Sequence, residues 1–249
     1  MNKVLVVGGA GFIGSNFTDL LKTKNDVKWQ VVDKFTYAAY HKPSIVYSDP
    51  FSHYFKVDIC DTKRMRNVIN DFKPDYIVNF AAETHVDRSI DNSYQSEFLN
   101  TNIMGTHVLL SLAMECGVKK FVQISTDEVY GSLENVEEAG FTEESSLMPN
   151  NPYSASKASA DNLCRAFYRT YDFPVVITRC SNNYGPNQHT EKFIPSMIQH
   201  AIQGEPLPLY GDGSNIRDWI NVMDHCRAVY EVMVSGTPGE VYNIGANQE

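Results

Sequence analysis

Short apolar runs alternate with amphipathic stretches along most of this 249-residue chain. The runs predict strands near residues 3–8, 28–33, 54–57, 75–80, 119–125 and 174–180. Apolar positions at helical spacing predict helices near 12–23, 62–72, 94–116 and 152–171. Strands that alternate with helices build a mostly parallel sheet covered on both faces, so the sequence predicts an α/β, doubly wound fold.

Three glycines follow the first predicted strand at regular intervals. Gly8, Gly11 and Gly14 separate an apolar run from the start of an amphipathic helix. Without a Cβ at these positions, backbone N–H groups can approach a pyrophosphate at the helix N-terminus, where the helix dipole favours an anion. The motif predicts a Rossmann-type dinucleotide site, although a glycine-rich turn without a ligand is common when such a motif stands alone.

An acidic residue, Asp33, ends the second predicted strand, 19 residues after Gly14. Such a carboxylate can accept both ribose hydroxyls of an adenosine and repels a 2′-phosphate, which favours NAD over NADP. Lys34 follows directly and weakens that preference. Asp58 closes a third run and could meet the adenine edge, but an exposed acid at a strand end is the commoner explanation.

Tyr153 and Lys157 stand four residues apart and share one face of the predicted helix 152–171. A tyrosine has an ordinary pKa of about 10, and a nearby ammonium group together with a cationic nicotinamide would lower it. This pair predicts hydride transfer to a nicotinamide cofactor. The same spacing also occurs by chance on amphipathic helices.

Thr126, Asp127 and Glu128 follow the predicted strand 119–125 and would set two carboxyls beside the Tyr–Lys pair. Acid/base elimination needs one carboxyl ionised and the other protonated, and unequal burial can split their pKa values in that direction. The alternative is that Asp127 and Glu128 cap a following turn.

Composition narrows the class of protein. A net charge of -9 argues against nonspecific nucleic-acid binding, which needs clustered basic surface. Five widely separated cysteines without a Cys-x-x-Cys pair suggest reduced thiols in a cytoplasmic setting, with no disulfide framework and no metal site. The chain opens directly into a strand, so no signal peptide is visible, and no apolar run is long enough to span a membrane.

Six segments carry a resemblance to a known family. They are residues 8–14 (GGAGFIG), 84–89 (THVDRS), 125–131 (STDEVYG), 153–157 (YSASK), 179–186 (RCSNNYGP) and 215–219 (NIRDW). In this order they resemble the extended short-chain dehydrogenase/reductase family and, within it, the dTDP-glucose 4,6-dehydratases. The resemblance covers essentially the whole chain. Tyr-x-x-x-Lys marks only the superfamily, whereas Thr-Asp-Glu marks the dehydratase branch.

The resemblance implies dehydration of a nucleotide-activated glucose, most directly dTDP-glucose, to its 4-keto-6-deoxy product with NAD as cofactor. Tyr153 would take the C4 hydroxyl proton, Lys157 would supply positive charge and hold the nicotinamide ribose, and Thr126 would bond the C4 oxygen. Glu128 would then remove the acidic C5 proton while Asp127 protonates the departing C6 hydroxyl. Hydride would return to C6, so NAD is regenerated.

The resemblance also implies binding positions. The cofactor would contact Gly8, Gly11, Phe12, Ile13, Gly14, Asp33, Lys34, Asp58, Ile59, Ala81, Ala82, Thr101, Tyr153, Lys157 and Asn183. The nucleotide sugar would contact Thr84, Asp127, Asn182, Lys192, Phe193, Pro208, Tyr210 and Arg217. Arg217 has the planar donor fork that phosphate recognition favours, but a structural ion pair explains it equally well.

The alternation of strands and helices breaks from about residue 181, where turn-rich segments such as 182–187 and 211–214 begin. We expect residues 1–180 to form an NAD-binding domain that carries the catalytic residues. Residues 181–249 would form a partial substrate-binding lobe, interleaved with that domain.

The chain departs from the family pattern in three places. Val7 stands where the family usually has Thr, and residues 37–41 (YAAYH) replace the usual Tyr-Ala-Gly-Asn run. The chain ends at Glu249, within a segment that relatives continue, so we expect either a truncation or a naturally short version. Two other functions stay open: a UDP-, GDP- or CDP-sugar dehydratase or epimerase on the same fold, and a noncatalytic NAD-binding regulator.

The predicted helices 94–116 and 152–171 carry more apolar residues than one sheet-facing stripe requires, among them Leu109, Leu112 and Phe167. A homodimer built on a two-fold bundle of these helices, as in relatives, would use them. A thick core within one chain is the alternative.

Overall fold

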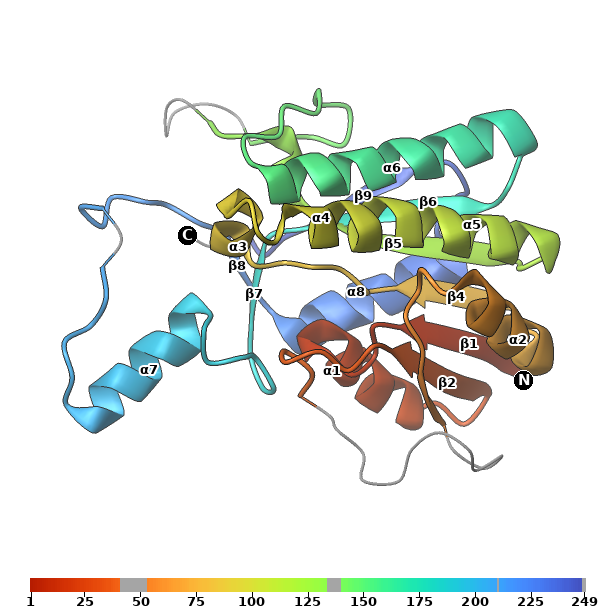
Figure 1. Cartoon of the computed structure of the whole chain (residues 1–249), viewed down its shortest axis with the longest axis horizontal. Helices are drawn as coiled ribbons and strands as arrows, with labels where there is room; N and C mark the ends of the chain where they lie inside the picture. Colours follow the sequence, from red (N-terminus) through yellow and green to blue (C-terminus); the bar gives the residue numbers. More distant parts are fainter. Residues whose placement is uncertain (41–52, 134–139, 210, 248–249) are drawn as a thin grey trace.

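The computed structural model describes residues 1–40, 53–133, 140–209 and 211–247. Seven parallel strands form its main sheet, in the order β3-β2-β1-β4-β5-β6-β9 (Figure 1). Their bounds are β1 (Asn2–Val7), β2 (Val27–Asp33), β3 (Tyr54–Lys56), β4 (Tyr76–Asn79), β5 (Lys120–Thr126), β6 (Val175–Cys180) and β9 (Val241–Ile244). The predicted doubly wound parallel sheet is confirmed.

Helices cover both faces of this sheet, because its central strands are apolar on both sides. On β1, Leu5 and Val7 face a core shared with α2 (Thr62–Phe72), α5 (Thr106–Glu115) and α6 (Pro152–Tyr171). Val4 and Val6 point the other way, into a core shared with α1 (Phe12–Lys22) and α8 (Val222–Ser235). Figure 1 shows α5 and α6 side by side along one face and α1 with α8 along the other.

The helix predicted over 94–116 is confirmed as a continuous helical stretch of three consecutive pieces, and its π-helical middle was not predicted. They are α4 (Gln95–Phe98), the π-helix η1 (Leu99–Gly105) and α5. The Asn102 side chain accepts from the Glu83 N–H (2.9 Å) and donates to the Glu83 carbonyl (3.0 Å) and to Ser156 Oγ (2.8 Å). These hydrogen bonds connect the π-helix to the loop after β4 and to α6. A π-bulge often accompanies a functional site, and here it brings Thr101 to the cavity described below.

The sequence also left several elements unpredicted. These are α3 (Val86–Ile90), a 3-10 turn η2 (Asp127–Tyr130), β7 (Asn182–Tyr184), α7 (Phe193–Gln203), β8 (Trp219–Asn221), α8 and β9. Strands β7 and β8 pair with each other in a second, two-stranded sheet. After residue 180, strand β9 joins the main sheet and α8 packs on α1. This part of the chain therefore contributes to the main sheet and its covering helices as well as to the region around α7. The division into two domains at residue 180 stays a prediction.

Helix α7 stands apart from the sheet and its covering helices (Figure 1). It is apolar on one side, yet none of its residues is buried, and Ile202 is 81% exposed. By contrast, Leu109, Leu112 and Phe167 are buried in the core of this chain. The thick single core therefore accounts for these three residues.

All five cysteines are unpaired. Within the described ranges, no helix combines the length and the apolar character that crossing a bilayer requires. The same ranges contain no group of three or more His, Cys, Asp or Glu side chains placed to hold a metal ion.

Candidate active site

A cavity of about 420 Å³ opens at the carboxyl end of the main sheet. Segments that follow β1, β2, β3, β4, β5 and β6 line it, together with the first turns of α6. Residues far apart in the sequence meet there because the strands of a parallel sheet all end at one edge. Every position expected to contact the cofactor lines this cavity, namely Gly8, Gly11, Phe12, Ile13, Gly14, Asp33, Lys34, Asp58, Ile59, Ala81, Ala82, Thr101, Tyr153, Lys157 and Asn183.

The glycines between β1 and α1 have two different functions. Gly8 has a φ of +77°, and a Cβ there would overlap the backbone of Ala81, while a Cβ on Gly14 would overlap the carbonyl oxygen of Gly8. A Cβ on Gly11 would instead meet only that oxygen, at 3.5 Å. Helix α1 begins after Gly11 without a side-chain cap, so its first N–H groups can bind an anion. This open, uncapped turn fits a pyrophosphate.

Asp33 is held at the end of β2 by backbone groups. Its Oδ2 accepts from the Ala10 N–H (2.9 Å) and its Oδ1 from the Phe35 N–H (2.7 Å). Burial raises the pKa of Asp33, and these two N–H groups oppose the rise. Each carboxylate oxygen keeps a further lone pair for a ribose hydroxyl.

Lys34 and Asp58 form an ion pair of 2.8 Å at the edge of the cavity. Burial opposes the ionised form of Asp58, but bonds from Lys34 and from the Cys60 N–H outweigh it and lower the pKa of Asp58. In the sequence, Lys34 weakened the preference for NAD because its ammonium group could bind the 2′-phosphate of NADP. Since that ammonium group is paired with Asp58, it is less available to a 2′-phosphate.

Thr126 ends β5 and caps the turn that carries the two neighbouring carboxyls. Its hydroxyl donates to Asp127 Oδ1 (3.1 Å) and accepts from the Glu128 N–H (3.3 Å). Thr126, rather than Asp127 or Glu128, is therefore the cap of this turn. Burial raises the pKa of Asp127 to about 6, the Thr126 bond opposes the rise, and the Glu128 carboxyl adds to it. Glu128 lines the cavity and Asp127 does not, so the adjacent carboxyls lie in unlike environments.

Tyr153 and Lys157 both lie on α6, are buried and line the cavity. Lys157 Nζ donates to the carbonyl oxygen of Ile124 on β5 (2.6 Å). Burial raises the pKa of Tyr153, the Glu128 carboxylate adds to this rise, and the Thr126 hydroxyl opposes it. We expected positive charge to lower this pKa, but Lys157 is not among the groups that shift it. Burial is the main cause of the raised pKa of Tyr153 in this structure.

Burial also lowers the pKa of Lys157, and the Asp161 carboxylate opposes the fall. Asp161 lies one helical turn further along α6 and is paired with Arg179 on β6, whose Nε donates to Asp161 Oδ2 (2.9 Å). Arg179 also donates to the Tyr130 hydroxyl (2.9 Å). A buried network of charges thus lies directly behind Lys157.

Four of the positions expected to contact the sugar or the diphosphate line the cavity: Thr84, Asn182, Lys192 and Phe193. Lys192 Nζ donates to the carbonyl oxygen of Thr84 (3.1 Å). Burial lowers the pKa of Lys192, and the neighbouring Glu191, Glu128 and Asp87 carboxylates oppose the fall.

The other substrate positions are not gathered there. Asp127, Pro208 and Arg217 do not line the cavity, and Arg217 is exposed with its NH1 donating to the Ile216 carbonyl (2.7 Å). Pro208 and Arg217 both come after α7 in the chain. Tyr210 lies outside the described residues.

Several residues around the cavity were not predicted as contacts. Glu83, Cys180, Gln188, His189 and Glu191 line it. No motif marks them individually, and only their place directly after strands or within the turn-rich segment could have suggested them.

Three loops meet at the rim of the cavity. The Tyr37 hydroxyl lies 3.4 Å from Glu191 Oε1, and the Arg88 guanidinium stacks 4.7 Å from the centre of the Tyr37 ring. His85 and His189 each place a ring nitrogen 3.7 Å from Glu191 Oε2. Residues after β2, β4 and β7 are thereby joined across the opening.

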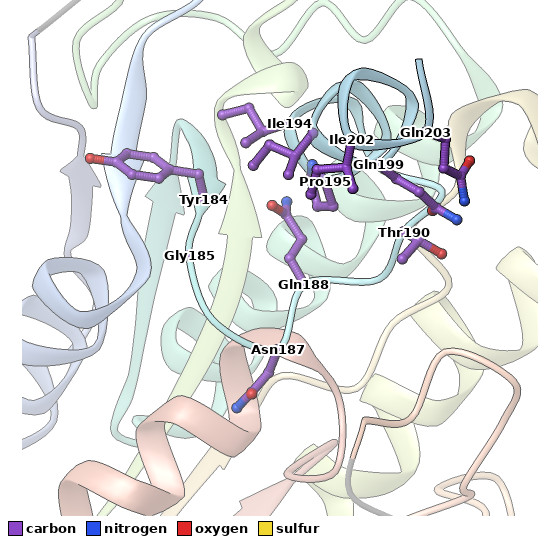
Figure 2. Close-up of a pocket in the computed structure, with 11 residues that line it drawn as sticks. Tyr184, Gly185, Asn187, Gln188, Thr190, Ile194, Pro195, Gln199, Ile202 and Gln203 are labelled. Carbon is purple, nitrogen blue, oxygen red and sulfur yellow. The ribbon is translucent and has the colours of Figure 1, made fainter. Parts of the chain in front are cut away.

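A second hollow, of about 450 Å³, lies between α7 and residues 184–190. Figure 2 shows Ile194, Pro195 and Ile202 of α7 on one side of it and the loop that carries Gln188 on the other. Its described lining has no carboxylate, imidazole or ammonium group, so acid/base chemistry belongs to the cavity at the carboxyl end of the main sheet.

Comparison with known proteins agrees with this geometry. The family described as NAD dependent epimerase/dehydratase matches residues 4–245. The low-salt glycan biosynthesis protein Agl12 of Haloferax volcanii is 49% identical over 247 residues, which cover 99% of this chain and 77% of that protein. The dTDP-glucose 4,6-dehydratase of Neisseria meningitidis serogroup B is 46% identical over 260 residues, covering 100% of this chain and 72% of the relative.

A solved structure extends the comparison to three dimensions. The crystal structure of the dTDP-glucose 4,6-dehydratase of Bacillus anthracis in complex with NAD superposes with a TM-score of 0.88 at 46% identity. The match covers 100% of this chain and 76% of that one.

Proposed function

The chain belongs to the NAD-dependent epimerase/dehydratase family, and on that premise we propose that it dehydrates a nucleotide-activated glucose, most directly dTDP-glucose, to the 4-keto-6-deoxy sugar. One observation carries the choice of dehydration over simple oxidation. Asp127 and Glu128 are adjacent, and burial raises the pKa of Asp127 to about 6, while Glu128 lines the cavity. Elimination of water needs such a proton donor beside a base.

The residues of the cavity fit NAD. The uncapped start of α1 and the open face of Gly11 suit the pyrophosphate, and Asp33 suits the adenosine ribose. Tyr153 and Lys157 would hold the nicotinamide ribose at the far end of the cavity. What bound NAD supplies is a hydride acceptor for C4 and a hydride donor for C6.

At C4 the residues of the chain would orient the hydroxyl and take its proton. Thr126 and Tyr153 both line the cavity, so the C4 oxygen can lie between their hydroxyls. Because burial and Glu128 raise the pKa of Tyr153, a tyrosinate there needs added positive charge, which Lys157 and a bound cationic nicotinamide would have to supply together. Asp161 behind Lys157 favours the ammonium form of that lysine.

At C5 and C6 the two carboxyls would act in opposite directions. Once C4 is a ketone, the C5 hydrogen is acidic, and Glu128 takes it as a proton. Asp127 gives its proton to the C6 hydroxyl, which leaves as water while a double bond forms between C5 and C6. When hydride arrives at C6, Glu128 returns its proton to C5. The proton that Tyr153 took at C4 equals the one that Asp127 gave up at C6, so an exchange of protons with solvent restores both groups and the net change is loss of one water molecule.

The substrate side of the cavity supports an anionic sugar nucleotide. Lys192 provides a cation there and is bonded to Thr84, and Asn182 also lines the cavity. Because burial weakens the charged form of Lys192, a diphosphate would restore the favourable environment of its ammonium group.

The direct test is incubation of the chain with dTDP-glucose and with UDP-glucose, followed by mass spectrometry of the product. We expect a 4-keto-6-deoxy sugar, with dTDP-glucose the better substrate and no net consumption of NAD. A C4 epimer that keeps its C6 hydroxyl would instead identify an epimerase. Binding of NAD without product from either sugar would favour the noncatalytic regulator over an enzyme.

We further propose that the chain acts in the cytoplasm as a homodimer through helices in 94–116 and 152–171. The five free cysteines support a reducing compartment. Leu99 and Met104, on the π-helix between α4 and α5, are 54% and 53% exposed and would suit a helix bundle with a second copy. Sedimentation equilibrium tests this proposal, and a single species of 28.1 kDa at high concentration would overturn it.

A further inference from the structure

Asn151 connects one catalytic carboxylate to the helix that carries the other catalytic side chains. It is the N-cap of α6, where its Oδ1 accepts from the Ser154 N–H (2.8 Å) and its own N–H donates to Ser154 Oγ (3.2 Å). Its Nδ2 donates to Glu128 Oε2 (3.2 Å). The bonds to the Ser154 N–H and to Glu128 use the oxygen and the nitrogen of one side-chain carboxamide.

The cap determines which end of the Asn151 amide faces Glu128. A backbone N–H can only donate, so the amide atom that meets Ser154 must be the oxygen. The other end is then the NH₂ group, which is the correct partner for a carboxylate. The start of α6 therefore presents a donor to Glu128 as a consequence of its own capping.

Resting on the proposed function, we propose that Asn151 is a positioning residue that holds Glu128 where it takes the C5 proton. Glu128 lies in a short turn, where its N–H is bonded to Thr126. Asn151 adds a bond from the start of α6, and Tyr153 is only two residues further along that helix. The base of the C5 step and the base of the C4 step thereby share one support.

The charged groups around Glu128 show why such a support matters. The charge of its carboxylate acts to raise the pKa values of Asp127, Tyr153 and Lys192. Each of these three groups has a different function in the proposed reaction. Over the described ranges no ion pair joins Glu128 to Lys192, whose Nζ is bonded to Thr84 instead. Asn151 gives Glu128 a neutral partner, so the carboxylate can act as a base while Lys192 stays available to the substrate.

Two variants separate the bond to Glu128 from the helix cap. Asn151→Ser and Asn151→Asp both keep a good N-cap for α6, but neither supplies the amide donor. Asn151→Asp also places a second negative charge beside Glu128. The neighbouring Asn150→Ser serves as a control, because the Asn150 amide donates to Ser132 (3.0 Å) rather than to Glu128.

The experiment follows two steps in one single turnover of dTDP-glucose in D₂O. Near-ultraviolet absorbance reports hydride transfer from C4, mass spectrometry reports C5 exchange with solvent, and melting temperatures check the fold. We expect Asn151→Ser to slow C5 exchange about ten-fold, the effect of one hydrogen bond to a charged group, and Asn151→Asp to slow it more. Transfer from C4, the melting temperature and the Asn150→Ser variant should remain at parent values.

Two results would overturn the inference while leaving the proposed function intact. One is an unchanged rate of C5 exchange in both Asn151 variants. The other is an equal loss of the C4 and C5 steps, which would mean that Asn151 acts only through the start of α6. A parent chain that shows neither C4 transfer nor C5 exchange would refute the proposed function itself, and this inference with it.

Discussion

Gly14 packs so closely over the carbonyl oxygen of Gly8 that a Cβ on Gly14 would overlap that atom. The contact closes the turn between β1 and α1 and sets the direction in which the helix leaves the sheet. Gly11, between them in the sequence, would place a Cβ at an ordinary contact distance of 3.5 Å from the same oxygen. The same motif therefore contains a glycine needed for folding and a glycine whose open side faces the cofactor site.

This difference predicts that alanine at Gly14 lowers stability, whereas alanine at Gly11 weakens NAD binding. Gly14→Ala should lower the free energy of unfolding by about 2 kcal/mol or more, because the overlap must be relieved by moving backbone. Gly11→Ala should unfold at the parent temperature but bind NAD about ten-fold more weakly, because the new methyl group occupies the approach of the pyrophosphate. Thermal unfolding and calorimetric titration with NAD measure the two effects. Equal behaviour of the two variants in both measurements would contradict this assignment.

The proposed base can be tested by an isosteric change. Glu128→Gln keeps an oxygen for the Asn151 donor but cannot accept the C5 proton. We expect C4 oxidation to continue while C5 exchange with D₂O falls by at least about 10²-fold, the usual contribution of a general base. Nuclear magnetic resonance of the sugar recovered from D₂O measures the exchange, and undiminished exchange would remove Glu128 from this function.

The raised pKa of Asp127 predicts a pH dependence for water loss. A carboxyl with a pKa of about 6 still carries its proton at pH 5, where an ordinary aspartate, with a value of 3.8, has lost it. Elimination by Asp127 should therefore weaken as pH rises through about 6, since the protonated fraction then falls. Single-turnover rates of water loss between pH 5 and pH 8 measure this decline, which is the descending limb of the pH–rate profile near pH 6.

The matching variant is Asp127→Asn, which has no proton to give. It should reduce water loss by about 10²-fold or more and abolish the limb near pH 6. C4 oxidation serves as the internal control, because Asp127 has no part in it. A variant that kept the same limb would assign it to another group.

The Asp161–Arg179 pair should be important for stability as well as for Lys157. Their side chains are 1% and 6% exposed, so Asp161→Ala would leave a buried guanidinium without its partner. We expect a loss of about 3–5 kcal/mol in the free energy of unfolding, measured by urea denaturation. The control is Asp224→Ala, which breaks the exposed Asp224–Arg227 pair and should change stability by less than about 1 kcal/mol.

The sequence predicted the main sheet well because its signals are local. The apolar run of β1 is buried on both faces and the glycines after it mark a tight turn, so six of the seven main strands follow from the pattern alone. Strand β9 escaped prediction because it is four residues long and finds its partner β6 more than sixty positions earlier. The π-helix escaped because its cause, the bonds of Asn102 to Glu83 and Ser156, joins distant segments.

The candidate site divides in the same way. The sequence by itself determined which groups are present: a glycine turn, Asp33, the Thr126–Glu128 segment, and Tyr153 with Lys157 one helical turn apart. Only the tertiary structure decided their states, because burial and through-space charge set a pKa. It gave Asp127 a raised pKa, paired Lys34 with Asp58, and directed the Asn151 amide at Glu128. Spacing along a chain fixes which side chains share a helix face, whereas desolvation depends on everything that packs around them.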